Sequence, residues 1–161
     1  MQSLHPKHFL FGAAIMYVCS FSAILFTGYK ESNDLHLSNK FLSIADKLIS
    51  QSKYTEAILS AHEAVRYRKN NPMAHFSVGL ALYHQEAYNE CIKEMTEANH
   101  ILTQLGGNST YPAADLYLGK SYLKLKKYSE SKKELRLAAD SNMAEVKSEA
   151  EGILSFIKYK Y

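Results

Sequence analysis

A small residue followed nine positions later by a tyrosine occurs three times in this chain of 161 residues. From the first copy to the second, both members of the pair shift by one common step, and from the second to the third they shift by a longer common step. An insertion therefore separates the last two copies, and we place it at residues 106–111. Self-similarity at a fixed period predicts a stack of repeated units, each of which buries its apolar face only against its neighbours. The three pairs are Ala45 with Tyr54, Gly79 with Tyr88, and Gly119 with Tyr128.

Each copy is expected to hold two helices. A small residue in each helix lets the two approach closely where they cross, and large residues such as the three tyrosines fill the next layer. Pro72 and Pro112 each stand at the first turn of a predicted helix, where the missing N–H costs nothing. An amphipathic segment after the third copy is predicted to cap the open end of the stack. The predicted helices run from 35 or 38 to 52, then over 54–69, 72–86, 88–105, 112–126, 128–140 and 144–158.

The repeats resemble the tetratricopeptide repeat (TPR) family, whose unit is a pair of helices joined by a turn. The second copy carries the resemblance best, in Val78, Gly79, Leu82, Tyr88, Cys91, Met95 and Ala98. The family's tryptophan position holds Phe41, His75 and Asp115, and no copy has the closing proline in its usual place. The resemblance implies an all-α TPR solenoid over residues 38–145. Its three repeats would span 38–71, 72–105 and 112–145, with a capping helix at 146–161.

An apolar segment precedes the repeats. Residues 1–8 form a short polar tail, and residues 9–29 contain no Asp, Glu, Lys or Arg. A helix of that length spans about 31 Å, which matches a hydrocarbon core of about 30 Å. We therefore predict a transmembrane helix at 9–29, in contact with the lipid bilayer, and a polar linker at 30–37. A cleaved signal peptide is the alternative, with Lys7 in its basic region, but the length of the apolar run favours an uncleaved anchor.

The charges around this segment predict its orientation. Lys7, the N-terminal amine, His5 and His8 lie before it, whereas Lys30 and Lys40 lie after it. A short tail is easier to leave untranslocated than a folded domain is. We therefore expect a single-pass protein whose repeats lie on the periplasmic side of a bacterial inner membrane.

No catalytic or ligand-binding motif is present. A formal charge of +3 is too small to indicate nucleic-acid binding. The chain lacks a Gly-rich phosphate loop, an H-E-x-x-H helix, a G-x-S-x-G elbow and paired-cysteine metal motifs. Its two cysteines, Cys19 and Cys91, are read as structural. We therefore expect no enzymatic activity, no cofactor, no metal, and neither a nucleic-acid nor a small-molecule partner.

The family resemblance and the predicted anchor together imply a membrane-anchored protein-interaction module. We expect a scaffold or assembly subunit of a membrane complex, and the alternative is a receptor that captures peptides or precursors in a transport or import system. An adaptor for the acidic C-termini of chaperones would require a clamp of Lys, Asn and Arg side chains. The corresponding positions do not match, because they hold Leu42, Asp46, Ser77, Ala113 and Tyr117.

The resemblance also implies a binding surface, since TPR proteins usually hold partners in a concave groove lined by the first helix of each repeat. Here that surface would have an apolar floor and a basic rim, which favours a partner with an apolar stripe flanked by acids. The alternative is that the chain's own C-terminal helix or N-terminal segment covers this floor. The predicted groove residues are Phe76, Leu80, Tyr83, His84, Leu116, Tyr117, Lys120, Leu123 and Lys124.

Overall fold

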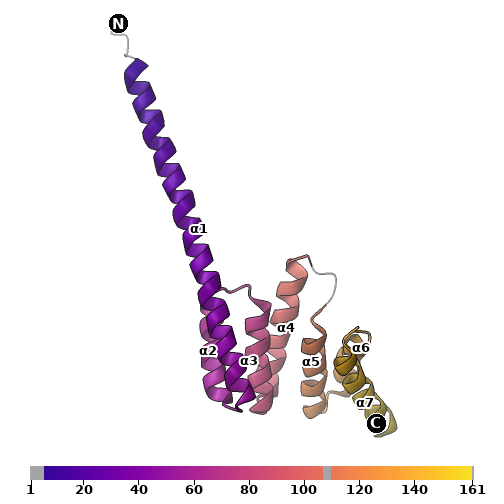
Figure 1. Cartoon of the computed structure of the whole chain (residues 1–161). Coiled ribbons are helices and arrows are strands. Elements are labelled where there is room, and N and C mark those ends of the chain that lie inside the picture. The colour runs from indigo at the N-terminus through magenta and orange to yellow at the C-terminus, as the bar shows by residue number, and fades with distance from the viewer. Residues whose placement is uncertain (1–5, 107–109, 161) are drawn as a thin grey trace. The chain divides into compact units, whose positions relative to one another are not determined.

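A computed structural model describes the backbone of residues 6–106 and 110–160, and the side chains of residues 27–106 and 110–159. Within these residues the chain is entirely α-helical (Figure 1). The seven helices are α1 (Pro6–Ser50), α2 (Tyr54–Tyr67), α3 (Pro72–His84), α4 (Tyr88–Gln104), α5 (Pro112–Lys124), α6 (Tyr128–Ala139) and α7 (Ala144–Lys160). From α2 onward, every helix starts at the residue that the sequence predicts.

The chain divides into two units, Met1–His36 and Leu37–Tyr161. The first unit contains the N-terminal part of α1, and the second contains the remainder of α1 and helices α2 to α7. The segment 30–37, expected as a linker, is helical and belongs to α1. Of the predicted insertion, Gly106, Thr110 and Tyr111 lie outside any helix, whereas residues 107–109 lie outside the described part of the chain.

The predicted membrane location is wrong. Among the residues that the structure describes, no helix is at once long enough and apolar enough to cross a membrane. The polar stretch from Lys30 to Asp34, expected to separate the anchor from the repeats, instead continues the helix. Residues 9–26 of the expected span have side chains that lie outside the described part of the structure. We therefore withdraw the predictions that the repeats lie in the periplasm and that residues 9–29 contact the bilayer.

The turn between the two helices of each copy has the same geometry in all three copies. Ser52, Glu86 and Lys126 each have a positive φ, at 59°, 62° and 61°. In the first copy, the N–H of Ser52 donates to the carbonyl of Ile49, and the N–H of Lys53 donates to the carbonyl of Leu48. The other two turns repeat both bonds. This pair of bonds defines the Schellman motif, which closes a helix by a left-handed residue.

The helices of the second unit pack in two rows. Each of α2 to α6 contacts the next helix along the chain, and contacts also join α3 to α5 and α5 to α7. The hydroxyl of Ser77 on α3 donates to Asp46 on α1 over 2.8 Å, so the end of α1 belongs to the same row as α3. The row of first helices is therefore the C-terminal part of α1, then α3, α5 and α7. Helices α2, α4 and α6 form the second row.

Small residues set the distance between the two helices of each copy. A Cβ atom added at Gly79 would lie 3.0 Å from the Cε of Met95, and one added at Gly119 would lie 2.5 Å from the Cγ of Leu135. Both partners are fully buried. In the first copy, Ala45 and Ala61 occupy the equivalent positions and are also fully buried. The spacing that reveals the repeats in the sequence thus follows from close helix contact.

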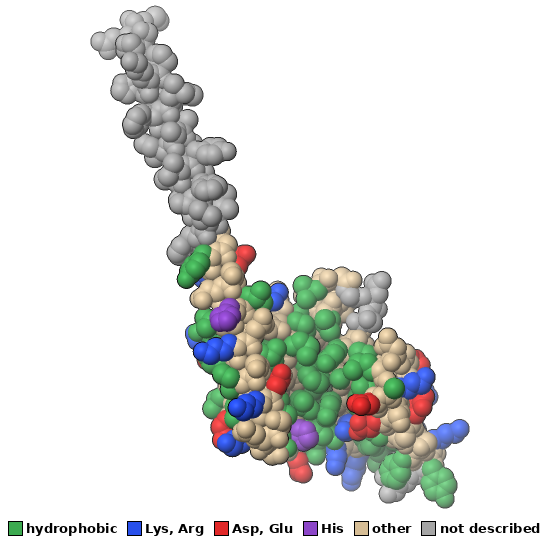
Figure 2. Space-filling model, in the orientation of Figure 1, with side chains coloured by type: hydrophobic (Ala, Val, Ile, Leu, Met, Phe, Trp, Pro, Cys, Tyr) green, Lys and Arg blue, Asp and Glu red, His purple; other side chains and the backbone are tan. Residues whose placement is uncertain are grey.

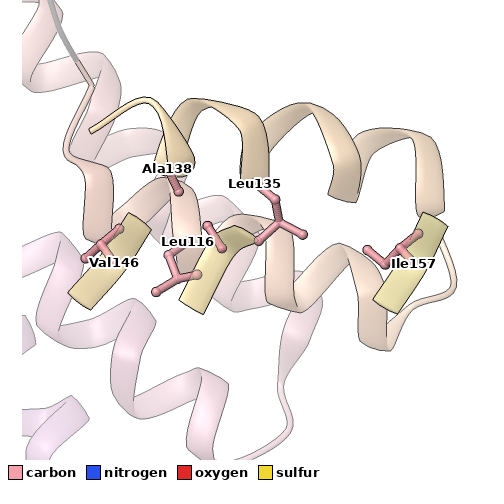
Figure 3. Packing of buried hydrophobic residues seen from close by; sticks show 6 residues of the cluster. Leu116, Leu135, Ala138, Val146 and Ile157 are labelled. Atoms are coloured by element: carbon pink, nitrogen blue, oxygen red, sulfur yellow. The ribbon is translucent and has the colours of Figure 1, made fainter. Parts of the chain in front are cut away.

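Helix α7 closes the end of the stack. Val146, Ala150 and Ile157 of α7 form one buried cluster with Leu116 of α5 and with Leu135 and Ala138 of α6. Figure 3 shows these side chains converging from the three helices. Because α7 follows α5 in the row of first helices, it covers the face that would otherwise be open at the end of the third copy.

Candidate functional site

Aromatic side chains from α3 and α5 meet on the row of first helices. The rings of Tyr83 and Tyr117 lie edge to face, with centroids 5.1 Å apart. Phe76 contacts Tyr117 at 6.3 Å and Tyr111 at 4.9 Å, again edge to face. We call the surface formed by these rings and Leu80 the aromatic face. Its residues are Phe76, Leu80, Tyr83, Tyr111 and Tyr117. Edge-to-face pairs place the positive edge of one ring against the negative face of the other, which fixes the positions of the rings.

The aromatic face is only partly buried. Phe76, Leu80, Tyr83 and Tyr117 all retain part of their solvent-accessible surface, although they pack against a buried cluster that includes Met95. Figure 2 shows hydrophobic side chains gathered in the middle of the second unit, between margins that carry charged residues. Rings that are fixed from behind and open in front lose little conformational entropy when a partner binds.

Lys120 lies beside this face. Its ammonium group stands 4.7 Å from the centroid of the Tyr117 ring and 5.2 Å from that of Tyr83. It also donates to the Oε1 of Glu149 on α7, over 2.8 Å. Burial by itself would lower the pKa of Lys120, but the hydrogen bond to Glu149 and the nearby tyrosines raise it overall. Lys120 is therefore charged at physiological pH.

The same environment affects the neighbouring groups. Burial raises the pKa of Tyr83 and of Tyr117, while Lys120 acts in the opposite direction on both. His84 stacks on Tyr54 with ring centroids 4.8 Å apart, and burial, assisted by Lys120, lowers its pKa. The aromatic face therefore presents neutral rings, an uncharged imidazole at its edge and one fixed cation.

The structure separates the nine predicted groove residues into three groups. Phe76, Leu80, Tyr83, Tyr117 and Lys120 lie close together, and His84 lies at their edge. Lys124 is exposed at the end of α5. Leu116 is only 4% exposed and belongs to the core under α7, and Leu123 packs against that core. Leu116 is therefore not part of an accessible floor, because α7 covers it.

Three residues near the site were not predicted from the sequence. Tyr111 was assigned to the insertion, although its place directly before Pro112 sets it at the start of α5. Tyr54 was read only as a packing residue. Glu149 lies 29 positions beyond Lys120 and gives no local signal, so only the packing of α7 reveals the contact.

Polar residues replace tryptophan at the family's tryptophan position in the second and third copies. The Nδ1 of His75 lies 2.8 Å from a carboxylate oxygen of Glu94 on α4. This hydrogen bond raises the pKa of His75, against the effect of burial. Asp115 is fully buried and accepts hydrogen bonds from Asn99 and Thr110. Burial nevertheless raises the pKa of Asp115. Both contacts tie the first helix of a copy to its surroundings, and they have structural roles.

Cys91 has no features of a reactive thiol. Its side chain is buried, and the hydroxyl of Ser121 donates to its sulfur over 3.2 Å. Burial raises the pKa of this thiol to about 11, so almost none of it is ionised near neutrality. Within the described residues, no group of three or more His, Cys, Asp and Glu side chains is placed to hold a metal ion.

Neither a protein-family model nor a curated protein matches this chain. Solved structures do match it. The Yersinia enterocolitica type III secretion translocator chaperone SycD, in an alternative dimer, aligns with a TM-score of 0.70 at 15% identity, over 78% of this chain and 94% of that one. A second structure of SycD aligns with a TM-score of 0.68 at 16% identity, over 76% and 83% of the two chains.

The first TPR of Spaghetti (RPAP3), bound to the HSP90 peptide SRMEEVD, aligns with a TM-score of 0.67 at 19% identity. The alignment covers 78% of this chain and 94% of that one. Because the sequence identities are this low, the structural alignments establish the fold alone. With the three equal turns and the two rows of helices, they confirm that this chain has a TPR-like helical repeat fold.

Proposed function

We propose that this chain is a protein-binding module whose aromatic face holds an apolar segment of a partner protein. The observation that carries the proposal is the pair Tyr83 and Tyr117, whose rings are fixed by edge-to-face contact yet remain partly open to solvent. Tyrosine is enriched at the energetic centres of protein interfaces, because it buries a large rigid surface at small entropic cost.

The solved neighbours support a binding role. One is named a translocator chaperone, and another is bound to an HSP90 peptide. The way of binding proposed here differs from a clamp of Lys, Asn and Arg around a terminal carboxylate. Two positions of such a clamp hold Asp46 and Ser77, which are hydrogen-bonded to each other. An aromatic surface with one cation beside it therefore replaces a cationic pocket.

Selection of random dodecapeptides displayed on phage against the full chain tests this proposal. The affinity of the most enriched peptide is then measured by fluorescence anisotropy. Replacing Tyr83 and Tyr117 together with Ser is expected to weaken binding by at least about tenfold, since truncating one such residue costs about 2 kcal/mol. Leu59→Ser is the matched control, because Leu59 on α2 is 65% exposed and lies outside the aromatic face.

Circular dichroism shows whether each variant keeps its helices and its cooperative melt. A folded double variant that binds as tightly as the unaltered chain would place the site elsewhere. If no peptide is enriched, the aromatic face does not bind extended segments. A folded Leu59→Ser variant that loses binding would move the site to α2.

We propose further that the module acts as a scaffold or assembly subunit, with transient capture of peptides as the alternative. The two roles differ in the lifetime of the complex. Native sizing of a cell extract separates them, since a scaffold co-migrates with a large assembly throughout purification. A chain that elutes alone and exchanges its peptide within seconds is a capturing receptor.

A further inference from the structure

Asp46, Leu80 and Lys120 occupy equivalent positions in the three copies, because each directly follows the small residue that marks the first helix of its copy. The row of first helices therefore carries an acid in the first copy, an apolar residue in the second and a base in the third. A segment that crosses the row meets opposite charges at its two ends. An acidic side chain of such a segment is repelled at Asp46 and attracted at Lys120.

The ammonium group of Lys120 is already positioned for a carboxylate. Two tyrosine rings hold it, with centroids 4.7 Å and 5.2 Å away, and a carboxylate of this same chain, Glu149, binds it over 2.8 Å. The Glu149 side chain is 49% exposed, whereas that of Lys120 is 20% exposed. Lys120 is thus held by the aromatic face, while Glu149 reaches it from the solvent side of α7.

Glu149 contributes little to the packing of α7. The residues that anchor this helix are the buried side chains Val146, Ala150 and Ile157. An ion pair with a half-exposed partner contributes little stability, since water solvates the freed carboxylate well. Another carboxylate can therefore replace Glu149 without unfolding the cap.

We propose that a carboxylate of the bound partner replaces Glu149 on Lys120, so that the aromatic face selects apolar segments that carry an acid at the third-copy end. Helix α7 then acts as a built-in competitor for acidic partners. This inference rests on the proposed function, since it assigns the chemistry of the segment that the aromatic face holds.

The test uses the full chain and a dodecapeptide enriched on it, synthesised with an amidated C-terminus. A matched peptide has each Glu or Asp replaced by Gln or Asn. A third form has a free C-terminus, which separates a side-chain carboxylate from a terminal one. Affinities for all three are measured by fluorescence anisotropy.

Two variants of the chain isolate the exchange. Glu149→Gln keeps the size of the side chain and removes the competing charge. Glu151→Gln is the matched control, because Glu151 also lies on α7 but pairs with Lys147 of the same helix, at 4.0 Å. We expect Glu149→Gln to bind the acidic peptide about two- to fivefold more tightly, which corresponds to an exposed ion pair, and to bind the neutral peptide as the unaltered chain does. Glu151→Gln should match the unaltered chain with both peptides.

Lys120→Met completes the test. It keeps an unbranched side chain over the tyrosine rings and removes the charge, so it should bind the acidic and neutral peptides equally. Its circular dichroism melt shows that the fold is retained. If Lys120→Met unfolds, the preference of the unaltered chain for the acidic peptide must instead weaken as salt is raised, because salt screens the charge pair.

The outcomes separate this inference from the proposed function. If no peptide binds, both fail. If the peptides bind but carry no acid, or if Glu149→Gln gains no more than Glu151→Gln, only the exchange at Lys120 is overturned. A preference that appears solely with the free C-terminus assigns the carboxylate to the end of the partner chain.

Discussion

The first helices of the second and third copies present equivalent apolar surfaces, but this surface is partly open in the second copy and covered in the third. Phe76 and Tyr83 on α3 remain partly open, whereas Leu116 and Leu123, at the equivalent positions of α5, pack against the core formed with α7. The first helices of the two copies have 13 residues each, and both are followed by a left-handed turn residue. The side chains differ in kind, since the open copy uses aromatic rings and the covered copy uses leucines.

The difference teaches how a repeat surface becomes either core or a partly open surface. A first helix exposes an apolar stripe, and the side chains that the next helix in the row brings to it decide how far the stripe is covered. Helix α7 covers the third copy in this way. Helix α5 follows the second copy in the row, but the aromatic residues of that copy meet Tyr111 and Tyr117, which stay partly exposed. Tyrosines suit such a partly open surface, because one end of the side chain is apolar and the other is hydrated.

The largest expected effect on stability comes from truncating one leucine to alanine on each of the two surfaces. Leu116→Ala should lower the free energy of unfolding by about 2–5 kcal/mol, as for a buried leucine. Leu80→Ala should cost about 1 kcal/mol, since Leu80 is only partly buried and solvent fills the space. Urea unfolding followed by circular dichroism measures both. Equal losses would mean that the second-copy surface is core as well.

The glycines offer a second comparison of the two copies. Gly119→Ala should destabilise by about 1–3 kcal/mol, because the new Cβ would lie 2.5 Å from Leu135, which is fully buried and branched at that atom. Gly79→Ala should cost less than about 1 kcal/mol, since its Cβ meets the flexible end of Met95 at 3.0 Å. Thermal unfolding ranks the pair. The reverse order would show that the third copy relaxes more easily than its packing indicates.

Ionisation distinguishes the copies near neutral pH. The pKa of His75 is raised above 6.5, chiefly by the hydrogen bond with Glu94, so the contact stabilises the fold fully below 6.5 and weakens as pH rises through the folded-state pKa. We expect the free energy of unfolding to fall by about 1 kcal/mol as the pH rises from 6.5 through this pKa. The pKa of Asp115 in the third copy is raised from 3.8 by burial, so this carboxyl lowers the stability of the fold as the pH rises from 3.8 through its folded-state pKa.

Unfolding of the unaltered chain and of Glu94→Gln, measured at intervals from pH 6.5 upward, checks this expectation. The variant should show a flatter profile, since its amide cannot pair with an imidazolium charge. A decline that persists unchanged in Glu94→Gln would assign the pH dependence to another group.

The sequence predicted the fold well because its signals are local. A small residue, a tyrosine nine positions later and a proline at a helix start each act within one helix pair, and they place the starts of α2 to α6 correctly. The sequence left the coverage of Leu116 open, as the alternative in which the C-terminal helix covers the floor, because the outcome depends on how far α7 reaches across α5. The contacts of Asp115 with Asn99, and of Lys120 with Glu149, join separate helices in the same way.

The membrane prediction relied on the length of an apolar run, whereas no described helix is both long enough and apolar enough to cross a membrane. The separate prediction of a linker assumed that the polar residues after this run would end the helix. Instead α1 continues from Pro6 to Ser50 without a break. Charged residues are compatible with a helix, and a run of Lys, Glu, Ser, Asn and Asp without Gly or Pro contains no strong helix terminator.

The smallest expected effect on stability concerns the left-handed turns, whose geometry is the same in the two copies. Glu86 and Lys126 are exposed residues in left-handed turns, a conformation that is unfavourable for side chains with a Cβ and free of that cost for glycine. Glu86→Gly and Lys126→Gly should each stabilise the fold by about 0.5 kcal/mol, after the entropic cost of glycine is subtracted. Thermal unfolding should show the same increase for both glycine variants, because the turns have the same hydrogen bonds whether or not α7 covers the copy.

The controls for these turns are Glu86→Ala and Lys126→Ala, which keep the Cβ and should therefore give no gain. An alanine variant that gains as much as its glycine counterpart would trace the effect to the lost charge instead of the backbone. A larger gain at Lys126 than at Glu86 would mean that the cap strains the third turn. The two copies would then differ in their backbone as well as in their coverage.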